Sequence, residues 1–256
     1  MYTVEGLKKD RGIFQSMRID VIMLISGLSP EALERRRSVL QSYASEGTEV
    51  RLVETRNAPP SVDSLPEMEL AAPGILERAL MSQGEGADAV VIWGGHDPSL
   101  EAARNLVDIP VMAPGMASMY LASMLADTFA LIIQLSNVMK VAERQVNDLG
   151  LEDRCNGIYS VDLPVLELRE PEGFQRVLET ALEAVEDGAD AICFGCMALN
   201  DHSDTLQEEL DQHFPGVMVI HPGMAVIRQT ELIVELGYTH SKLSYPSPPK
   251  PIRFPE

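Results

Sequence analysis

The sequence predicts an α/β fold of two pseudo-symmetric lobes, each a mainly parallel four-stranded sheet flanked by helices, with an active site between the lobes. Three observations lead to this prediction. Short β-branched runs alternate with longer amphipathic segments, which is typical of parallel sheets. Two segments recur roughly a hundred residues later in the chain. The length of 256 residues fits one large domain or two small lobes and can supply a full hydrophobic core.

Eight short apolar runs are predicted to be the strands. Apolar strands that are separated by helices indicate a parallel sheet, and the first four would form one sheet and the last four the other. In chain order, the predicted strands cover residues 19–25, 49–53, 89–93, 110–112, 129–133, 157–161, 191–194 and 217–220.

The amphipathic segments between these runs are predicted to be helices. One begins after Ser29, which would cap the helix, with Pro30 at its first position. The longest apolar stretch, residues 116–135, contains Asp127 and changes character there, so it is interpreted as a helix followed by a strand rather than as a membrane span. Further helices are expected at about residues 67–82, 136–149, 172–186 and 223–236.

An internal repeat supports the two-lobe prediction. The segment Glu85-Gly-Ala-Asp-Ala-Val-Val-Ile-Trp-Gly94 matches Asp187-Gly-Ala-Asp-Ala-Ile-Cys-Phe-Gly-Cys196, and Pro114-Gly-Met-Ala117 recurs as Pro222-Gly-Met-Ala225. Two matches in the same order argue against a chance similarity of two βα units. The predicted domains are residues 17–114 plus 222–245 for the first lobe, 115–221 for the second lobe, and 246–256 for an extended tail rich in proline.

Charge and composition exclude several classes of protein. With a formal net charge of −19, the chain lacks the basic surface that binding to a nucleic acid requires. The same charge argues against binding to an anionic membrane surface. Three cysteines are too few for a disulfide framework, and residues 1–16 have no apolar core of a signal peptide, so a cytoplasmic location is expected. The five histidines show no metal-ligand spacing, and no phosphate or dinucleotide glycine motif is present, so neither metal nor cofactor is predicted.

The repeat also predicts the position of a ligand site. Ligands of open parallel sheets bind beyond the carboxyl ends of the strands, and both repeated segments are such ends. A pseudo-symmetric pair of lobes would place Gly94 opposite Cys196. At the two repeated helix starts, the backbone N–H groups of Gly115, Met116 and Gly223 would hold a carboxylate or carbonyl oxygen, although these glycines fit tight turns equally well.

Cys196 is the strongest candidate for chemistry. It follows a strand and precedes a short polar helix start, a position that lowers the pKa of a thiol and makes its thiolate available. Cys193 lies inside the strand, where a buried cysteine acts as a small hydrophobic residue; a Cys-x-x-Cys redox pair is the alternative. Cys155 lies in a polar loop and is interpreted as incidental.

Several longer motifs point to a known family. They are Val91-Ile-Trp-Gly-Gly-His-Asp-Pro-Ser-Leu-Glu-Ala-Ala-Arg104, Gly150-Leu-Glu-Asp-Arg-Cys155, Leu163-Pro-Val-Leu-Glu-Leu168, Phe194-Gly-Cys-Met-Ala198 and Ser241-Lys-Leu-Ser-Tyr-Pro246. With them the chain resembles the hydantoin racemase branch of the aspartate/glutamate racemase superfamily along nearly its whole length. The resemblance implies a cofactor-free site between two lobes, where two facing cysteines serve as base and acid. It also implies a homo-oligomer.

The chain departs from the pattern of this branch at three places. Cys196 corresponds to the second family cysteine, whereas the first corresponds to Gly94, which cannot transfer a proton. The Asn-Pro-Asn-like turn that helps to hold the substrate is Ser26-Gly-Leu28 here, and a Thr-Thr pair is replaced by Ile133-Gln134. The candidate substrate-binding residues are Ser26, Gly94, Gly95, Gly115, Met116, Gln134, Ser136, Met197, His221 and Gly223.

The missing cysteine leaves several interpretations open. Only one proton transfer is needed if the chain is a lyase, a decarboxylase or a non-racemising isomerase; the related arylmalonate decarboxylase uses a single cysteine. Cys196 could instead be a nucleophile, as in the related maleate isomerases. His96 could replace the missing base, because histidine titrates near pH 6.5, although it could equally be a simple loop histidine. His221 could orient a substrate or pair with Cys196, or it could be a satisfied histidine at a strand end. An engineered change at Gly94 is a fourth explanation, but the altered turn at Ser26 favours natural divergence.

We therefore expect a cofactor-independent enzyme that transfers a proton next to a carbonyl or carboxylate group of a small polar compound. Single-cysteine chemistry at Cys196, as in a lyase, decarboxylase or isomerase, is favoured over a two-base racemase. One alternative is a racemase of hydantoins or related amino-acid derivatives with His96 as the second base. The other is a module that binds a small molecule without turnover.

Overall fold

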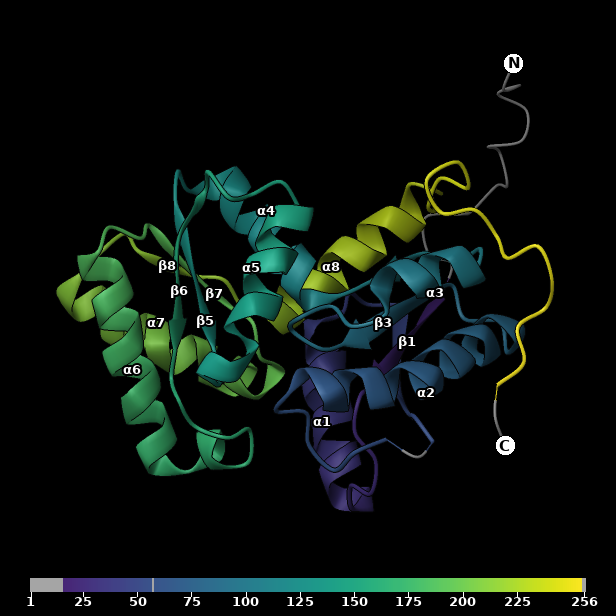
Figure 1. The fold of residues 1–256 in the computed structure, drawn as a ribbon, viewed down its shortest axis with the longest axis horizontal. Helices are drawn as coiled ribbons and strands as arrows, with labels where there is room; N and C mark the ends of the chain where they lie inside the picture. Colours follow the sequence, from purple (N-terminus) through teal and green to yellow (C-terminus); the bar gives the residue numbers. More distant parts are fainter. Residues whose placement is uncertain (1–15, 57, 255–256) are drawn as a thin grey trace.

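The chain forms two four-stranded sheets that lie side by side (Figure 1). The computed structural model describes residues 16–56 and 58–254, so the last two residues of the predicted tail lie outside the described residues. The strand order is β2-β1-β3-β4 in the first sheet and β6-β5-β7-β8 in the second, and every pairing is parallel. The second sheet repeats the connectivity of the first, which confirms the predicted fold class.

All eight predicted strands are present: β3, β5 and β7 have the predicted ends, and the ends of the other five are shifted. β4 and β8 contain only two residues each, because each pairs with its neighbouring strand at two positions. The strands of the first sheet are β1 (Met17–Met23), β2 (Thr48–Glu54), β3 (Ala89–Trp93) and β4 (Val111–Met112). Those of the second sheet are β5 (Phe129–Ile133), β6 (Cys155–Ser160), β7 (Ala191–Phe194) and β8 (Met218–Val219).

The helices follow the predicted pattern, including the predicted start of α1, and differ from it in three respects. Ser29 caps α1, because its Oγ accepts a hydrogen bond from the N–H of Ala32 at 3.2 Å. The helix expected at 136–149 is divided into a 3₁₀ turn, Ser136–Val138, and α5. The separate helices α3 and α7 were not predicted. The α-helices are α1 (Pro30–Tyr43), α2 (Leu65–Gly84), α3 (Leu100–Leu106), α4 (Pro114–Leu125), α5 (Met139–Asp148), α6 (Pro171–Glu186), α7 (Ser203–His213) and α8 (Pro222–Glu235).

Helices α4 and α8 lie between the two sheets and contribute to the packing of both (Figure 1). Met116 of α4 and Ile227 of α8 are buried in the core of the first sheet. Met119 of α4 and Ala225 of α8 are buried in a core of the second sheet. The two helices that start with the repeated Pro-Gly-Met-Ala motif therefore join the halves, while the exact domain boundaries remain a prediction.

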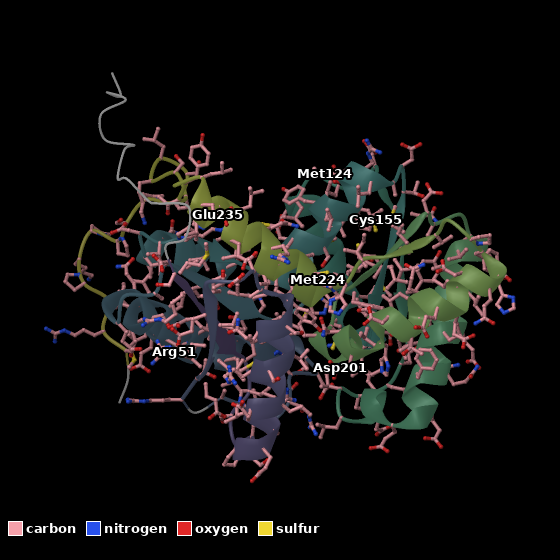
Figure 2. All side chains as sticks on the ribbon, turned by 180° about the vertical axis from the view of Figure 1, so that it is seen from behind. Arg51, Met124, Cys155, Asp201, Met224 and Glu235 are labelled. Atoms are coloured by element: carbon pink, nitrogen blue, oxygen red, sulfur yellow. The ribbon has the colours of Figure 1, made fainter. Side chains whose placement is uncertain are left out.

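The outward side of α4 and α8 carries exposed apolar side chains. Figure 2 shows Met124 and Met224 on this side of the molecule, and they are 79% and 46% exposed. A homo-oligomer remains a prediction, since the structure contains a single chain. Within the described residues, no helix has the length and apolarity needed to cross a membrane.

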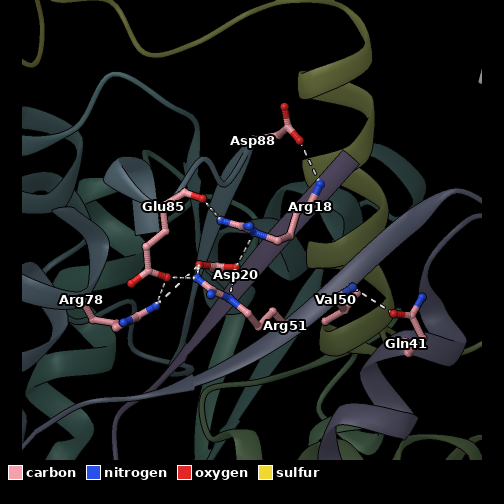
Figure 3. Close-up of polar contacts among 8 residues, drawn as sticks. All are labelled: Arg18, Asp20, Gln41, Val50, Arg51, Arg78, Glu85 and Asp88. Atoms are coloured by element: carbon pink, nitrogen blue, oxygen red, sulfur yellow. Dashed lines mark hydrogen bonds and ion pairs between the residues drawn. The ribbon is translucent and has the colours of Figure 1, made fainter. Parts of the chain in front are cut away.

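A charged cluster occupies the amino end of the first sheet (Figure 3). Asp20, in the middle of β1, has a fully buried side chain that forms ion pairs with Arg51 and, at 3.3 Å, with Arg18. Glu85 accepts hydrogen bonds from Arg51 at 2.5 Å and from Arg78 at 2.8 Å. The cluster ties β1, β2 and α2 together at the end of the sheet that is away from the candidate site.

Candidate active site

The two repeated strand ends meet at one cavity of about 200 Å³. Gly94 and Gly95 follow β3, and Cys196 follows β7, so the two strand ends that the repeat pairs both line this cavity. Besides the indole of Trp93, four side chains on the wall carry polar groups, namely Arg36, His96, Gln134 and Cys196. The other lining residues are Met23, Leu24, Ile25, Leu28, Pro60, Val62, Met68, Trp93, Gly94, Gly95, Pro98, Val165, Leu166, Gly195, Met197 and Ala198.

The backbones of the two strand ends are in direct contact. A Cβ atom added to Gly95 would lie 2.3 Å from the carbonyl carbon of Gly195 and 2.7 Å from the amide nitrogen of Cys196. Real Cβ atoms do not approach backbone atoms so closely, so only glycine fits at position 95. The absence of a Cβ atom at Gly95 therefore allows the backbones of the two halves to contact each other at the cavity.

The three cysteines have different surroundings. Cys196 is 7% exposed, lines the cavity and occupies the N-cap position of the 3₁₀ segment Met197–His202. Cys193 is fully buried in β7, where desolvation raises the pKa of its thiol far above the ordinary value. Burial also raises the pKa of Cys155 to about 11. Within the described residues none of the three forms a disulfide, and of the three only Cys196 lines the cavity.

His96 is held in the cavity wall as a neutral imidazole. Desolvation lowers the pKa of its ring to about 4, and the neighbouring side chains of Gln145 and Gln134 offset part of this shift. Both ring nitrogens are buried and lack a well-formed hydrogen bond within the described residues. At neutral pH the ring therefore has one N–H to donate and one lone pair that can accept a proton.

Asp97 is a buried residue that is not among the candidates predicted from the sequence. Its carboxylate accepts hydrogen bonds from the N–H groups of Gly115 at 2.9 Å and Met116 at 2.6 Å, at the start of α4. Desolvation raises the pKa of Asp97 to about 7. The analogous N–H of Gly223 donates to Asn200 at 3.0 Å. Each of these three N–H groups already donates to a side chain within the protein, so holding a ligand oxygen there, as expected from the sequence, would require that hydrogen bond to break.

Three further candidates lie away from the cavity lining. The hydroxyl of Ser26 donates to the carbonyl of Ala58 at 2.7 Å. Ser136 is exposed, and its N–H donates to Asp162 at 3.0 Å. His221 accepts a hydrogen bond from the N–H of Met224 at 3.2 Å, and its ring packs edge-on against Tyr43. These contacts are structural, so we do not assign the three side chains to a substrate.

The space beside Gly94 is already occupied. A Cβ atom added there would lie 2.6 Å from Cδ2 of Leu24 and 2.9 Å from Cδ of Pro98. A cysteine at this position would require both neighbours to move. The chain thus has compact apolar packing where the family resemblance places a second thiol.

The cavity also contains residues that were not predicted from the sequence to belong to the site. Arg36 comes from α1, Met68 from α2 and Val165 from the loop after β6. Arg36 is the one formal cation among the described lining residues. Its position on a polar helix is typical of an ordinary surface residue, so no local signal distinguishes it. No group of three or more His, Cys, Asp or Glu side chains that could hold a metal ion occurs in the described part of the chain.

An α/β protein with two repeated parallel sheets and a shared cavity at their carboxyl ends has the architecture of a small-molecule enzyme. The family model described as Asp/Glu/Hydantoin racemase matches residues 30–230, and the chain belongs to this family. It is 36% identical over 221 residues to a hydantoin racemase of Pseudomonas sp. (strain NS671), covering 84% of each chain. It is 30% identical to a hydantoin racemase of Rhizobium meliloti, covering 86% of this chain and 88% of the relative.

Solved structures agree with this assignment. An allantoin racemase from Klebsiella pneumoniae superposes with a TM-score of 0.84 at 31% identity, over 92% of this chain and 95% of that chain. An allantoin racemase from Pseudomonas fluorescens gives a TM-score of 0.82 at 25% identity, over 93% and 100%. Arylmalonate decarboxylase, with a TM-score of 0.57 at 16% identity over 85% and 92%, shares the fold.

Proposed function

We propose that this protein is a racemase of hydantoin-like compounds, that is, of cyclic or linear amide derivatives of amino acids. In this proposal, Cys196 and His96 are the two groups that exchange protons with the substrate. The observation that carries the proposal is the presence of both side chains on the wall of one cavity between the repeated strand ends. The similarity to hydantoin and allantoin racemases favours this reaction over the single-cysteine chemistry that the sequence suggested.

The reaction is a proton exchange at a carbon next to a carbonyl group. One group removes the proton, and the electron pair of the broken C–H bond moves into the carbonyl to form an enolate. The other group then delivers a proton to the opposite face of the same carbon. Cys196 acts as the thiolate base or thiol acid on one side. His96, neutral at pH 7, accepts a proton at its free ring nitrogen and returns it as an imidazolium.

The remaining lining suggests how a substrate would be oriented. Arg36 would attract the developing negative charge of the enolate, or a carboxylate of the substrate. Gln134 offers an amide for hydrogen bonds to a ring or chain amide. The apolar side chains of Leu24, Leu28 and Met68 would cover an apolar substituent. A substituted hydantoin combines these polar and apolar parts.

The packing around Gly94 favours a second candidate, in which only one face of the substrate receives a proton. Leu24 and Pro98 fill the space of a second thiol, so Cys196 would be the sole proton donor. Such an enzyme would be a lyase, decarboxylase or non-racemising isomerase. A third possibility is a module that binds the same compounds without turnover.

Proton NMR in D₂O tests the three candidates together. Single enantiomers of substituted hydantoins and of allantoin, together with an arylmalonate, are incubated with the protein and with the Cys196→Ala variant, and optical rotation is recorded in parallel. We expect exchange of the α-hydrogen with inversion, above the rate of a protein-free sample. Exchange without inversion, or loss of a carboxyl group, would establish single-face chemistry. Binding without exchange of any compound would contradict both enzyme proposals.

A further inference from the structure

Gln145 connects the second half of the molecule to the loop that carries His96. It lies on α5, and its Nε2 donates to the carbonyl of Gly95 at 2.9 Å and to the carboxylate of Asp97 at 2.8 Å. Both partners are acceptors, so the NH₂ group must point toward them. The amide of Gln145 therefore cannot turn over without losing both hydrogen bonds, and its oxygen must point the other way.

The oxygen of Gln145 is a buried acceptor beside an imidazole that needs one. Oε1 of Gln145 has no hydrogen-bond partner within the described residues, and the same is true of Oε1 of Gln134 and of both ring nitrogens of His96. Of the two amides, that of Gln145 is the one fixed by hydrogen bonds of its own. The Gln145 amide is bonded to both chain neighbours of His96, Gly95 and Asp97, and from this position its side chain favours protonation of the ring. The ring nitrogen that faces Gln145 is therefore the one that carries the hydrogen of the neutral imidazole.

The start of α4 shows that this arrangement is built into the fold. A Cβ atom added to Gly115 would lie 2.0 Å from the carbonyl oxygen of Gly95 and 2.4 Å from Nε2 of Gln145. The N–H groups of Gly115 and Met116 also hold the carboxylate that fixes Gln145. Glycine at position 115 thus leaves the room in which Gly95, Asp97 and Gln145 meet.

We propose that Gln145 is a positioning residue for His96: it sets the orientation of the ring and keeps its hydrogen on the nitrogen that faces Gln145. The other ring nitrogen then has its lone pair free for the substrate proton. Gln134, whose amide is not tied by comparable hydrogen bonds in the described structure, can adapt to this ring state. The catalytic consequence rests on the proposed function, whereas the state of the ring does not.

The test is nitrogen-15 NMR of histidine-labelled protein at pH 7. The ring signals of His96 are assigned by their loss in a His96→Asn variant. In the unmodified protein we expect one neutral tautomer, and in Gln145→Met a mixture of the two. The inversion rate of Gln145→Met should fall about 100-fold, with a much smaller change in KM, because a misplaced general base loses its alignment. Gln229→Met is the matched control, since Gln229 also donates from a helix to a backbone carbonyl, that of Ala117 at 2.8 Å, but away from His96.

Two outcomes would overturn the proposal. One is an unmodified protein in which His96 already exchanges between both tautomers, a result that needs no variant to fold. The other is a Gln145→Met variant that keeps a single tautomer, even if turnover is slower, because Gln145 would then only support the loop. A fixed tautomer in a protein that exchanges no substrate proton would contradict the proposed function and leave the role of Gln145 intact.

Discussion

The backbone of Gly95 lies against that of Cys196, with the Cβ position of the first 2.7 Å from the amide nitrogen of the second. These residues are roughly a hundred positions apart, and each follows the last strand residue of its repeated segment. The contact places Cys196, His96 and the filled space at Gly94 around one cavity. Four predictions follow from this geometry and from the buried charges of the first sheet.

Replacing Cys196 with alanine should abolish proton exchange without unfolding the protein. Loss of a general acid or base lowers turnover by about 10²- to 10⁴-fold, and the small side chain fits the same space. The measurement is α-hydrogen exchange in D₂O, with circular dichroism as the check on folding. Cys155→Ala is the matched control, because Cys155 lies at the start of β6 outside the cavity lining. Full activity of Cys196→Ala would refute a chemical role for this thiol.

The substitution Gly94→Cys should destabilise the protein, because the new side chain overlaps Leu24 and Pro98. Overpacking of this kind costs about 1–3 kcal/mol. In the double variant with Leu24→Ala, the loss in free energy of unfolding should be smaller than the sum of the two single losses, since truncation of Leu24 leaves space for the new thiol. Urea unfolding of the four proteins measures this coupling. The double variant should also invert substrate faster than Leu24→Ala alone, because a second thiol then shares the cavity with Cys196. Strict additivity would show that Leu24 does not occupy this space.

His96 should make the folded protein less stable as the pH falls. Its pKa is about 4 in the folded chain and 6.5 when unperturbed, so the unfolded chain binds the extra proton first. The stability is fully present above pH 6.5 and decreases toward pH 4. Between pH 7.5 and pH 5 the free energy of unfolding, relative to that of His96→Asn, should fall by about 2 kcal/mol. His213→Asn, at the exposed end of α7, is the matched control. A difference between the wild type and His96→Asn that stays constant with pH would contradict the low pKa.

Replacing Asp20 with asparagine should lower stability strongly while the cavity stays unchanged. The change leaves Arg18, Arg51 and Arg78 without the buried carboxylate that they surround, as Figure 3 shows. Removing one partner of a buried ion pair typically costs about 3–5 kcal/mol. Thermal and denaturant unfolding measure the effect. Glu34→Ala, which breaks the exposed pair with Arg37, should change little in comparison. Equal losses in the two variants would argue against a special role for the buried cluster.

Much of the fold could be predicted because the signals are local. The apolar runs at β3, β5 and β7 give the observed strands with their expected ends, and Ser29-Pro30 marks the start of α1. The lengths of β4 and β8 are not predictable from local composition, because pairing with the neighbouring strand decides where they begin and end. The helix α7 is not predicted because its sequence is largely polar. For the site, the repeat located Gly94 and Cys196 but gave no information on Arg36 or Gln145.

The sequence by itself determined the alternation of strands and helices, the twofold repeat, and the two strand ends at Gly94 and Cys196 that line the cavity, because each depends on short local patterns. Only the tertiary structure decided which polar groups reach the cavity. It bonded Gln145 to Gly95 and Asp97, the chain neighbours of His96, and it gave the N–H groups of Gly115 and Met116 to Asp97. The physical reason is that these hydrogen bonds join residues far apart in the chain, and their partners are selected by packing and burial.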